Sequence, residues 1–142
     1  MRIENLADGL HLNTFLLCED AREEVNSKYT VTGLFAGDEI KVAAFPASIR
    51  LAAFVDFIFE KRISAKSKLR VSFNGEPLFT AEVELAAPAD HGHMVLLLPS
   101  FNLPAAMPGQ IMFEVQVDDG EWHSIDRRNL TQGDIYPPKP AS

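Results

Sequence analysis

Pro108–Asp126 reads PGQIMFEVQVDDGEWHSID and decides the fold class of the chain. Every second residue of its first half is strongly apolar: Ile111, Phe113, Val115 and Val117. A period of two sends these side chains to one face of a β-strand. Asp118–Gly120 is typical of a turn, after which Glu121–Asp126 resumes an extended pattern. A hairpin with one apolar side is not stable alone, so we expect the rest of the chain to supply a second sheet.

The parity of the apolar residues predicts the turns of two hairpins. The apolar residues before and after Asn74-Gly75 are odd-numbered, as are those before and after Asp118–Gly120. A two-residue loop would pair odd with even positions and place the two apolar sets on opposite faces. We therefore predict a three-residue loop with a bulge in both hairpins, with a left-handed Gly75 in the first. In the second, Phe113 is predicted to lie opposite Ile125.

Other apolar runs predict further strands. They cover Leu12–Cys18, Tyr29–Phe35, Glu39–Phe45, Leu51–Phe59 and Met94–Leu98. Leu51–Phe59 is apolar at both parities apart from Asp56 and is rich in phenylalanine, which indicates a central strand covered on both faces. Pro46 and Pro99 are expected to end the strands before them, because proline donates no hydrogen bond to a β-ladder.

The segments between and beyond these strands complete the fold prediction. Met1–Gly9 is expected to be a loose lead-in, and Glu19–Lys28 a polar connector with one short helical turn. Eight or nine short strands, Gly and Pro turns and no long amphipathic helix predict an all-β, two-sheet antiparallel β-sandwich, with a closed β-barrel as the alternative. Residues 1–136 form this one domain, and residues 137–142, within a Pro-Pro-Lys-Pro stretch, are expected to be a flexible tail.

Composition and charge restrict the classes of partner. The chain has 142 residues, 46% of them hydrophobic and 23% charged, and a net charge of −7. This excess of acidic residues argues against nucleic acid and anionic membranes. A single cysteine, Cys18, excludes an internal disulfide and is expected to be a buried thiol. Because no signal peptide or long apolar span is visible, we expect no membrane contact and a cytoplasmic location.

Part of the chain resembles a known family. Phe15–Glu24, FLLCEDAREE, is followed by Lys28 and then by Val31–Phe35, VTGLF. An apolar strand, a Cys-Glu/Asp-Asp-x-Arg-x-Glu pattern and a Gly-aliphatic-aromatic step resemble the start of a family of small uncharacterised bacterial proteins. The similarity continues through Pro46 and Pro108-Gly109. The resemblance implies a domain of unknown function and supplies no reaction, ligand, partner or catalytic residue.

The Cys-Glu-Asp-x-Arg segment also has a physical interpretation. Asp20 follows the first strand, and Arg22 is placed to bridge its carboxylate as a structural clasp. The functional alternative is a calcium site made by four carboxylates: Glu19, Asp20, Glu23 and Glu24. The Asp/Gly spacing of an EF-hand loop is absent, which favours the clasp.

Asp90-His91-Gly92-His93 is the strongest metal candidate in the sequence. In an extended segment His91 and His93 project to the same face and are close enough to share Zn²⁺ or Cu²⁺. Third ligands compatible with this pair are Asp90, His123 and His11. The alternative is a polar, exposed loop between two strands, and with only two convincing ligands we favour it, with no cofactor.

Trp122 is the other binding candidate. With a three-residue loop it shares a face with Gln116 and Glu114 rather than with Phe113. An exposed tryptophan beside polar groups can stack on a sugar ring or anchor a protein interface. The alternative, in which a bulge turns Trp122 into the core or its rim, stays open.

No catalytic motif is visible. Ser100, Ser124, His123 and Asp126 form a triad only on paper, because no nucleophile elbow accompanies them. Ample strand signal without a catalytic motif predicts a non-enzymatic module for recognition or assembly, acting through a protein partner or a homodimer. The alternatives are a metal-binding domain or metal-dependent enzyme centred on His91 and His93, and a carbohydrate-binding module using Trp122.

Overall fold

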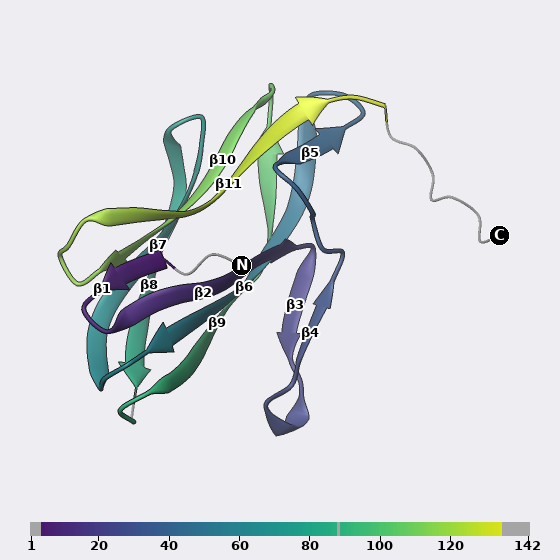
Figure 1. Ribbon diagram of the computed structural model, residues 1–142. Helices are drawn as coiled ribbons and strands as arrows, with labels where there is room; N and C mark the ends of the chain where they lie inside the picture. The colour runs from purple at the N-terminus through teal and green to yellow at the C-terminus, as the bar shows by residue number, and fades with distance from the viewer. Residues whose placement is uncertain (1–3, 88, 135–142) are drawn as a thin grey trace.

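The computed structural model describes residues 4–87 and 89–134, shown in colour in Figure 1. Within these residues the chain forms eleven strands, one 3-10 turn and no α-helix. The elements are β1 (Glu4–Ala7), β2 (Leu10–Cys18), β3 (Asp20–Glu23), η1 (Val25–Ser27), β4 (Tyr29–Thr32), β5 (Glu39–Val42), β6 (Ala47–Phe59), β7 (Ile63–Phe73), β8 (Glu76–Ala87), β9 (Gly92–Ala105), β10 (Gly109–Val117) and β11 (Trp122–Gln132). None of the described residues forms a helix long and apolar enough to cross a membrane.

Two sheets face each other. The four-stranded sheet has the order β1-β2-β6-β9, and the five-stranded sheet has the order β5-β11-β10-β7-β8. All ladders are antiparallel except the short pairing of β5 with β11, which is parallel. The prediction of an all-β sandwich is confirmed, and the described strands do not close into a barrel. The β3–β4 hairpin forms a separate two-stranded sheet, which projects beside the four-stranded sheet in Figure 1 and contacts it through β3.

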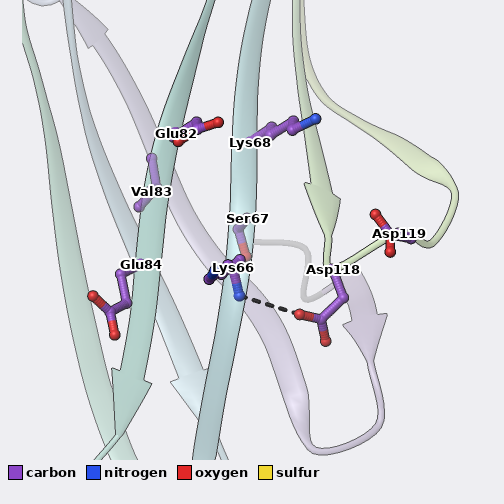
Figure 2. Close-up of a pocket in the computed structure, with 8 residues that line it drawn as sticks. All are labelled: Lys66, Ser67, Lys68, Glu82, Val83, Glu84, Asp118 and Asp119. Atoms are coloured by element: carbon purple, nitrogen blue, oxygen red, sulfur yellow. Dashed lines mark hydrogen bonds between the residues drawn. The ribbon is translucent and has the colours of Figure 1, made fainter.

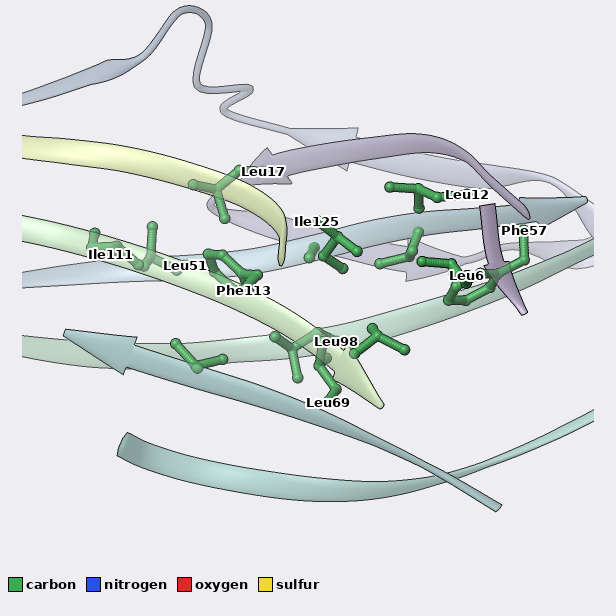
Figure 3. Close-up of a cluster of buried hydrophobic side chains, with 14 of the residues drawn as sticks. Leu6, Leu12, Leu17, Leu51, Phe57, Leu69, Leu98, Ile111, Phe113 and Ile125 are labelled. Carbon is green, nitrogen blue, oxygen red and sulfur yellow. The ribbon is translucent and has the colours of Figure 1, made fainter. Parts of the chain in front are cut away.

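The core fills the space between the two sheets. Figure 3 shows apolar side chains from β2, β6 and β9 meeting those from β7, β10 and β11. Phe113 is fully buried, and its ring centroid lies 5.1 Å from that of Phe15 on the opposite sheet. The period-two pattern at Ile111–Val117 thus gives the predicted result, with alternate residues directed into the core.

β6 is an inner strand of its sheet, as its apolar residues at both parities predicted, but it is covered on both faces only around Ala52, because Phe54, Asp56 and Ile58 on its outer side are partly exposed. It pairs with β2 on one side and with β9 on the other. Leu51 and Ala53 face the core, and Ala52 between them is also fully buried. Ala52 packs on the outer side against Cys18 and Ala21, because β3 lies over this end of β6.

Both hairpins contain an extra residue that adjusts which positions pair, but in the first hairpin this residue lies at another place than predicted. Asn74-Gly75 is a two-residue loop with both residues at positive φ, so the predicted three-residue loop is wrong. The extra residue is Leu78, where the register shifts between Val71 and Ser72. A bulge inside the strand restores the pairing of odd with odd positions that a bulged loop would also have given.

The second hairpin has its predicted register at the tip, where Gln116 pairs with Trp122. The register then shifts between Phe113 and Glu114, so that Phe113 lies opposite Asp126 and not opposite Ile125. Ile125 is the additional residue of this bulge and remains buried. The bulge reverses the inside and outside parity of the rest of β11.

Three expectations about the remaining segments are corrected. Met1–Gly9 contains β1, which pairs with β2, and the Glu19–Lys28 connector contains β3 as well as the 3-10 turn. Pro99 does not end its strand, because it lies in a bulge of the edge strand β9, where Pro99 and Ser100 are opposite Ala52, and proline is tolerated at bulges and edges. The predicted tail at 137–142 lies outside the described residues.

One core position predicts a gain in stability. The Ser67 side chain is 3% exposed, and within the described part of the chain its hydroxyl has no hydrogen-bond partner. Burying a hydroxyl without a partner costs about 1–3 kcal/mol, so Ser67→Ala is expected to raise the free energy of unfolding by about 1 kcal/mol in urea denaturation. The exposed Ser64→Ala is the matched control and should change little. A loss of stability in Ser67→Ala would show that the hydroxyl is satisfied.

Candidate interaction surface

The outer face of the five-stranded sheet is charged. Lys66 and Lys68 on β7 lie opposite Glu84 and Glu82 on β8. On the other side of β7, a nitrogen of Arg70 lies 3.0 Å from a carboxylate oxygen of Glu114. Alternating signs across neighbouring strands are typical of a solvated face, because each charge has an opposite one nearby.

Trp122 belongs to this charged face. It lies directly opposite Gln116, and the guanidinium carbon of Arg70 is 3.9 Å from its ring centroid. Arg70 donates to Glu114 through Nε and Nη2, and Gln116 donates to the carbonyl of Gly120. The two polar side chains proposed for sugar recognition are therefore bound to other groups of the chain, and Arg70 covers one face of the indole.

A cavity of about 510 Å³ opens beside the tip of the β10–β11 hairpin. Figure 2 shows Asp118 and Asp119 of the tip facing β7, where Asp118 accepts a hydrogen bond from the backbone N–H of Lys66 at 3.1 Å. The cavity is lined by Lys66, Ser67, Lys68, Glu82, Val83, Glu84, Asp118 and Asp119. The cavity therefore presents two ammonium groups and four carboxylates, and charges of both signs do not favour an anion over a cation as ligand.

The outer face of the four-stranded sheet has the opposite character. Three cross-strand rows follow from the register of β2, β6 and β9: Leu16–Phe54–Leu97, Thr14–Asp56–Val95 and His11–Ile58–His93. Five partly exposed apolar side chains form what we call the apolar face: Leu16, Phe54, Ile58, Val95 and Leu97. The two sheets therefore differ sharply, since one is ionic outside and the other is mainly apolar outside.

Asp56 is the one carboxylate in the middle of these three rows, and its side chain is hydrogen-bonded on this face. Its side chain is 13% exposed. Asn13, the additional residue of a bulge in β2, donates to Asp56 at 2.8 Å. His93 Nδ1 lies 3.0 Å from the same carboxylate. These contacts reduce the desolvation penalty that a partner would meet on covering Asp56.

The β3–β4 hairpin borders the apolar face. Tyr29 packs edge-on against Phe54, with 5.3 Å between the ring centroids. Val25 at the hairpin turn is 79% exposed, and Leu34, just after β4, is 55% exposed. Tyr29 thus extends the apolar face onto the hairpin, which carries two further exposed apolar residues, and exposed apolar patches mark interaction sites.

Asp20 and Arg22 make the contact that the clasp interpretation required. Both Nε and Nη2 of Arg22 donate to Oδ2 of Asp20, at 3.1 and 2.6 Å. Ser100 on β9 donates to the other Asp20 oxygen and to the backbone carbonyl of Glu19. The hydrogen bond from Arg22 lowers the pKa of Asp20 below its usual value, with Ser100 adding to the effect. The group thereby ties β3 to β9 and supports the border of the apolar face.

The metal candidates are engaged separately. His93 contacts Asp56, and Asp90 lies 3.4 Å from Arg62. His91 is exposed. No group of three or more His, Cys, Asp or Glu side chains within residues 4–87 and 89–134 is arranged to hold a metal ion. Cys18 is buried as predicted, and burial raises the pKa of its thiol.

The proposed triad is also not assembled. Ser100 is bound to Asp20 and the Glu19 carbonyl, whereas Asp126 accepts from Arg128 at 3.0 Å. The apolar face, by contrast, was missed at the sequence level. Its signal was present in Leu51–Phe59, because apolar residues at both parities indicate a strand whose outer side is also apolar.

Comparison with known proteins gives one match. The sequence model of a family described as Family of unknown function (DUF6941) matches residues 13–128. A comparison with curated proteins gives no significant match. The matched segment contains all five residues of the apolar face, and it confirms the part of the resemblance that implied a domain of unknown function.

Proposed function

The chain belongs to this family of unknown function, and we propose that it is a non-enzymatic recognition or assembly module that binds protein through the apolar face. The observation that carries the proposal is the contrast between the two sheets. One outer face pairs its charges across strands, whereas the other presents Leu16, Phe54 and Leu97 in a single row. A chain with a net charge of −7 has acidic residues available, yet this face carries mainly apolar ones.

The proposal includes the absence of catalysis and of a cofactor, and a cytoplasmic, bacterial setting. The absence of catalysis is supported by the hydrogen bonds of the candidate side chains: Glu114 is bound to Arg70, His93 to Asp56 and Ser100 to Asp20, so these groups do not line one shared cavity. Support for a reducing compartment comes from the single cysteine, Cys18, which is buried. The bacterial setting rests on the resemblance of the Cys-Glu-Asp-x-Arg segment alone.

Partner capture with variants of the two outer faces tests the proposal. The full chain serves as bait, with Phe54→Ser on the apolar face and Lys68→Ser on the charged face as the matched control. We expect a protein that wild type and Lys68→Ser retain and that Phe54→Ser binds at least about tenfold more weakly, because buried aromatic residues dominate interface energies. Affinities are then measured with the purified partner.

A folding control separates lost binding from lost structure. Circular dichroism and thermal unfolding must show that Phe54→Ser is folded. Ile58→Ser provides a second variant of the same face. A partner that binds Phe54→Ser and Ile58→Ser as well as wild type, but is lost in Lys68→Ser, would move the function to the charged face. Metal or glycan binding of comparable strength would favour the alternative functions.

A further inference from the structure

The four sheet edges of the sandwich differ in how they are protected. β1 and β5, at one edge of each sheet, have four residues each. β8 is long but carries three glutamates and a proline: Glu76, Glu82, Glu84 and Pro77. β9 has 14 residues, GHMVLLLPSFNLPA, without one Asp, Glu, Lys or Arg. Short length, charge and proline are the usual means by which an edge avoids pairing, and the first half of β9 uses none of them.

The free part of this edge is Gly92–Leu98. β9 pairs with β6 on one side only, and within the described residues no strand pairs with its other side. Beyond Leu98 the edge changes, because Pro99 and Pro104 lack an N–H and Ser100 is bound to the Asp20 region. Met94–Leu98, MVLLL, is therefore an unpaired, uncharged strand edge next to the apolar face.

We propose that β9 pairs antiparallel with β9 of a second copy of this chain, about a twofold axis at Leu96. The proposal rests on the assembly role proposed above and adds a second contact surface, the free edge beside the apolar face, with a second copy of the chain as its partner. Two edges of four-stranded sheets join in this way into one continuous sheet, with the backbone groups of Met94–Leu98 paired across the axis.

Parity fixes the register. Residues directly opposite each other in an antiparallel pair point to the same face of the sheet, so their numbers are both odd or both even. A twofold axis perpendicular to the sheet must therefore lie where one residue is opposite the same residue of the second copy, and not midway between two residues. An axis at Leu96 pairs Val95 with Leu97 of the second copy on the outer side. It pairs Leu96 with Leu96 of the second copy, and Met94 with Leu98 of the second copy, on the inner side. Every cross-strand pair in this stretch is then apolar with apolar.

Charge selects β9 over β8 as the self-pairing edge. Each copy carries a net charge of −7, so an edge that contributes no like charges to the contact is required. Pairing β8 with β8 of a second copy about an axis near Val83 would bring Glu82 and Glu84 against the same residues of the other copy. Pairing through β9 places no charged residue of one paired strand opposite another, since its sequence contains none.

Analytical ultracentrifugation and a register-specific disulfide test the proposal. Wild type should sediment as a dimer that dissociates on dilution. Val95→Lys, which puts two lysines near the axis, should raise the dimer dissociation constant at least about tenfold. Thr80→Lys on the exposed β8 edge is the matched control and should leave the dimer unchanged. The Leu96→Cys variant should form a disulfide between the two copies, because directly opposite residues of antiparallel strands lie within disulfide range.

Phe54→Cys separates edge pairing from stacking of two apolar faces. Cys18 is fully buried and gives the background for all cross-linking. A disulfide at position 54 and none at 96 would overturn edge pairing while leaving the apolar face as an interface. A monomer at every concentration, or a dimer with neither disulfide, would also overturn it, and partner capture would then decide the proposed function separately. If Val95→Lys fails to fold, the disulfide at 96 alone decides.

Discussion

Replacing Phe113 with alanine is expected to lower the free energy of unfolding by about 3–5 kcal/mol. Phe113 is fully buried in β10, where its backbone pairs with Val71 on one side and Asp126 on the other. Its ring meets that of Phe15 from the other sheet, with centroids 5.1 Å apart. The substitution removes the contact that joins the two layers and leaves a cavity that the flanking strands can close only in part, because the β-ladders fix their spacing.

Urea denaturation measures this effect. A domain of this size is stable by about 5–15 kcal/mol, so Phe113→Ala is expected to lose about a fifth of its stability or more, with an unchanged dependence on urea. The neighbouring Met112→Ala is the control, because Met112 points to the outer side and is partly exposed. A loss below about 1 kcal/mol in Phe113→Ala would mean that Phe113 does not join the two sheets.

The inward position of Phe113 could be predicted because side-chain alternation is a local property. A strand of any sheet places residues two apart on the same face, whatever the rest of the chain does. The bulges at Leu78 and Ile125 were not predictable from the same pattern. Parity requires one extra residue in each hairpin, and it is satisfied equally by a bulge in the loop and by one inside a strand.

The apolar face depends on register between distant segments. Leu16, Phe54 and Leu97 come from three strands separated by about 40 residues each, and only the pairing of β6 with both neighbours places them in one row. Strand β3 was hidden for another reason. It packs on the sheet through the small residue Ala21, so its polar sequence resembles that of a loop.

The bulge at Ile125 has a further consequence at Asp126 and Arg128. By simple alternation both even-numbered residues would point outward, but the reversed parity of β11 turns them inward. Their side chains are 16% and 10% exposed, and Arg128 donates to Asp126 and to the carbonyl of Phe35. An ion pair therefore lies at the rim of the core, where loss of either partner leaves a poorly solvated charge.

The pair predicts a dependence of stability on pH. Burial raises the pKa of Asp126 from 3.8 to about 6, although Arg128 acts in the opposite direction. Between these two values the folded protein binds the proton more tightly than the unfolded chain does, so the contribution of Asp126 to stability falls as pH rises. The loss on going from about pH 4 to about pH 7 is on the order of 2–3 kcal/mol.

Asp126→Asn isolates this contribution. An amide does not titrate, so the difference in free energy of unfolding between wild type and Asp126→Asn should decrease from about pH 4 to about pH 6 and then stay constant. The absolute stability of the variant is lower or higher according to how well the amide pairs with Arg128. The change of the difference with pH is therefore the quantity to measure, by urea denaturation at several pH values.

Two further variants should move the upper end of this pH dependence, which is set by the pKa of Asp126 in the folded protein, in opposite directions. The charge and hydrogen bond of Arg128 lower the pKa of Asp126, so Arg128→Met should shift the upper end above about 6 and destabilise the protein by about 3–5 kcal/mol at neutral pH. The negative charge of Asp38 raises that pKa, so Asp38→Asn should shift the upper end downward. Shifts in the same direction, or a pH profile unchanged by Asp126→Asn, would show that another group titrates. Opposite shifts would place the titrating carboxyl between Arg128 and Asp38, where the bulge at Ile125 directs it.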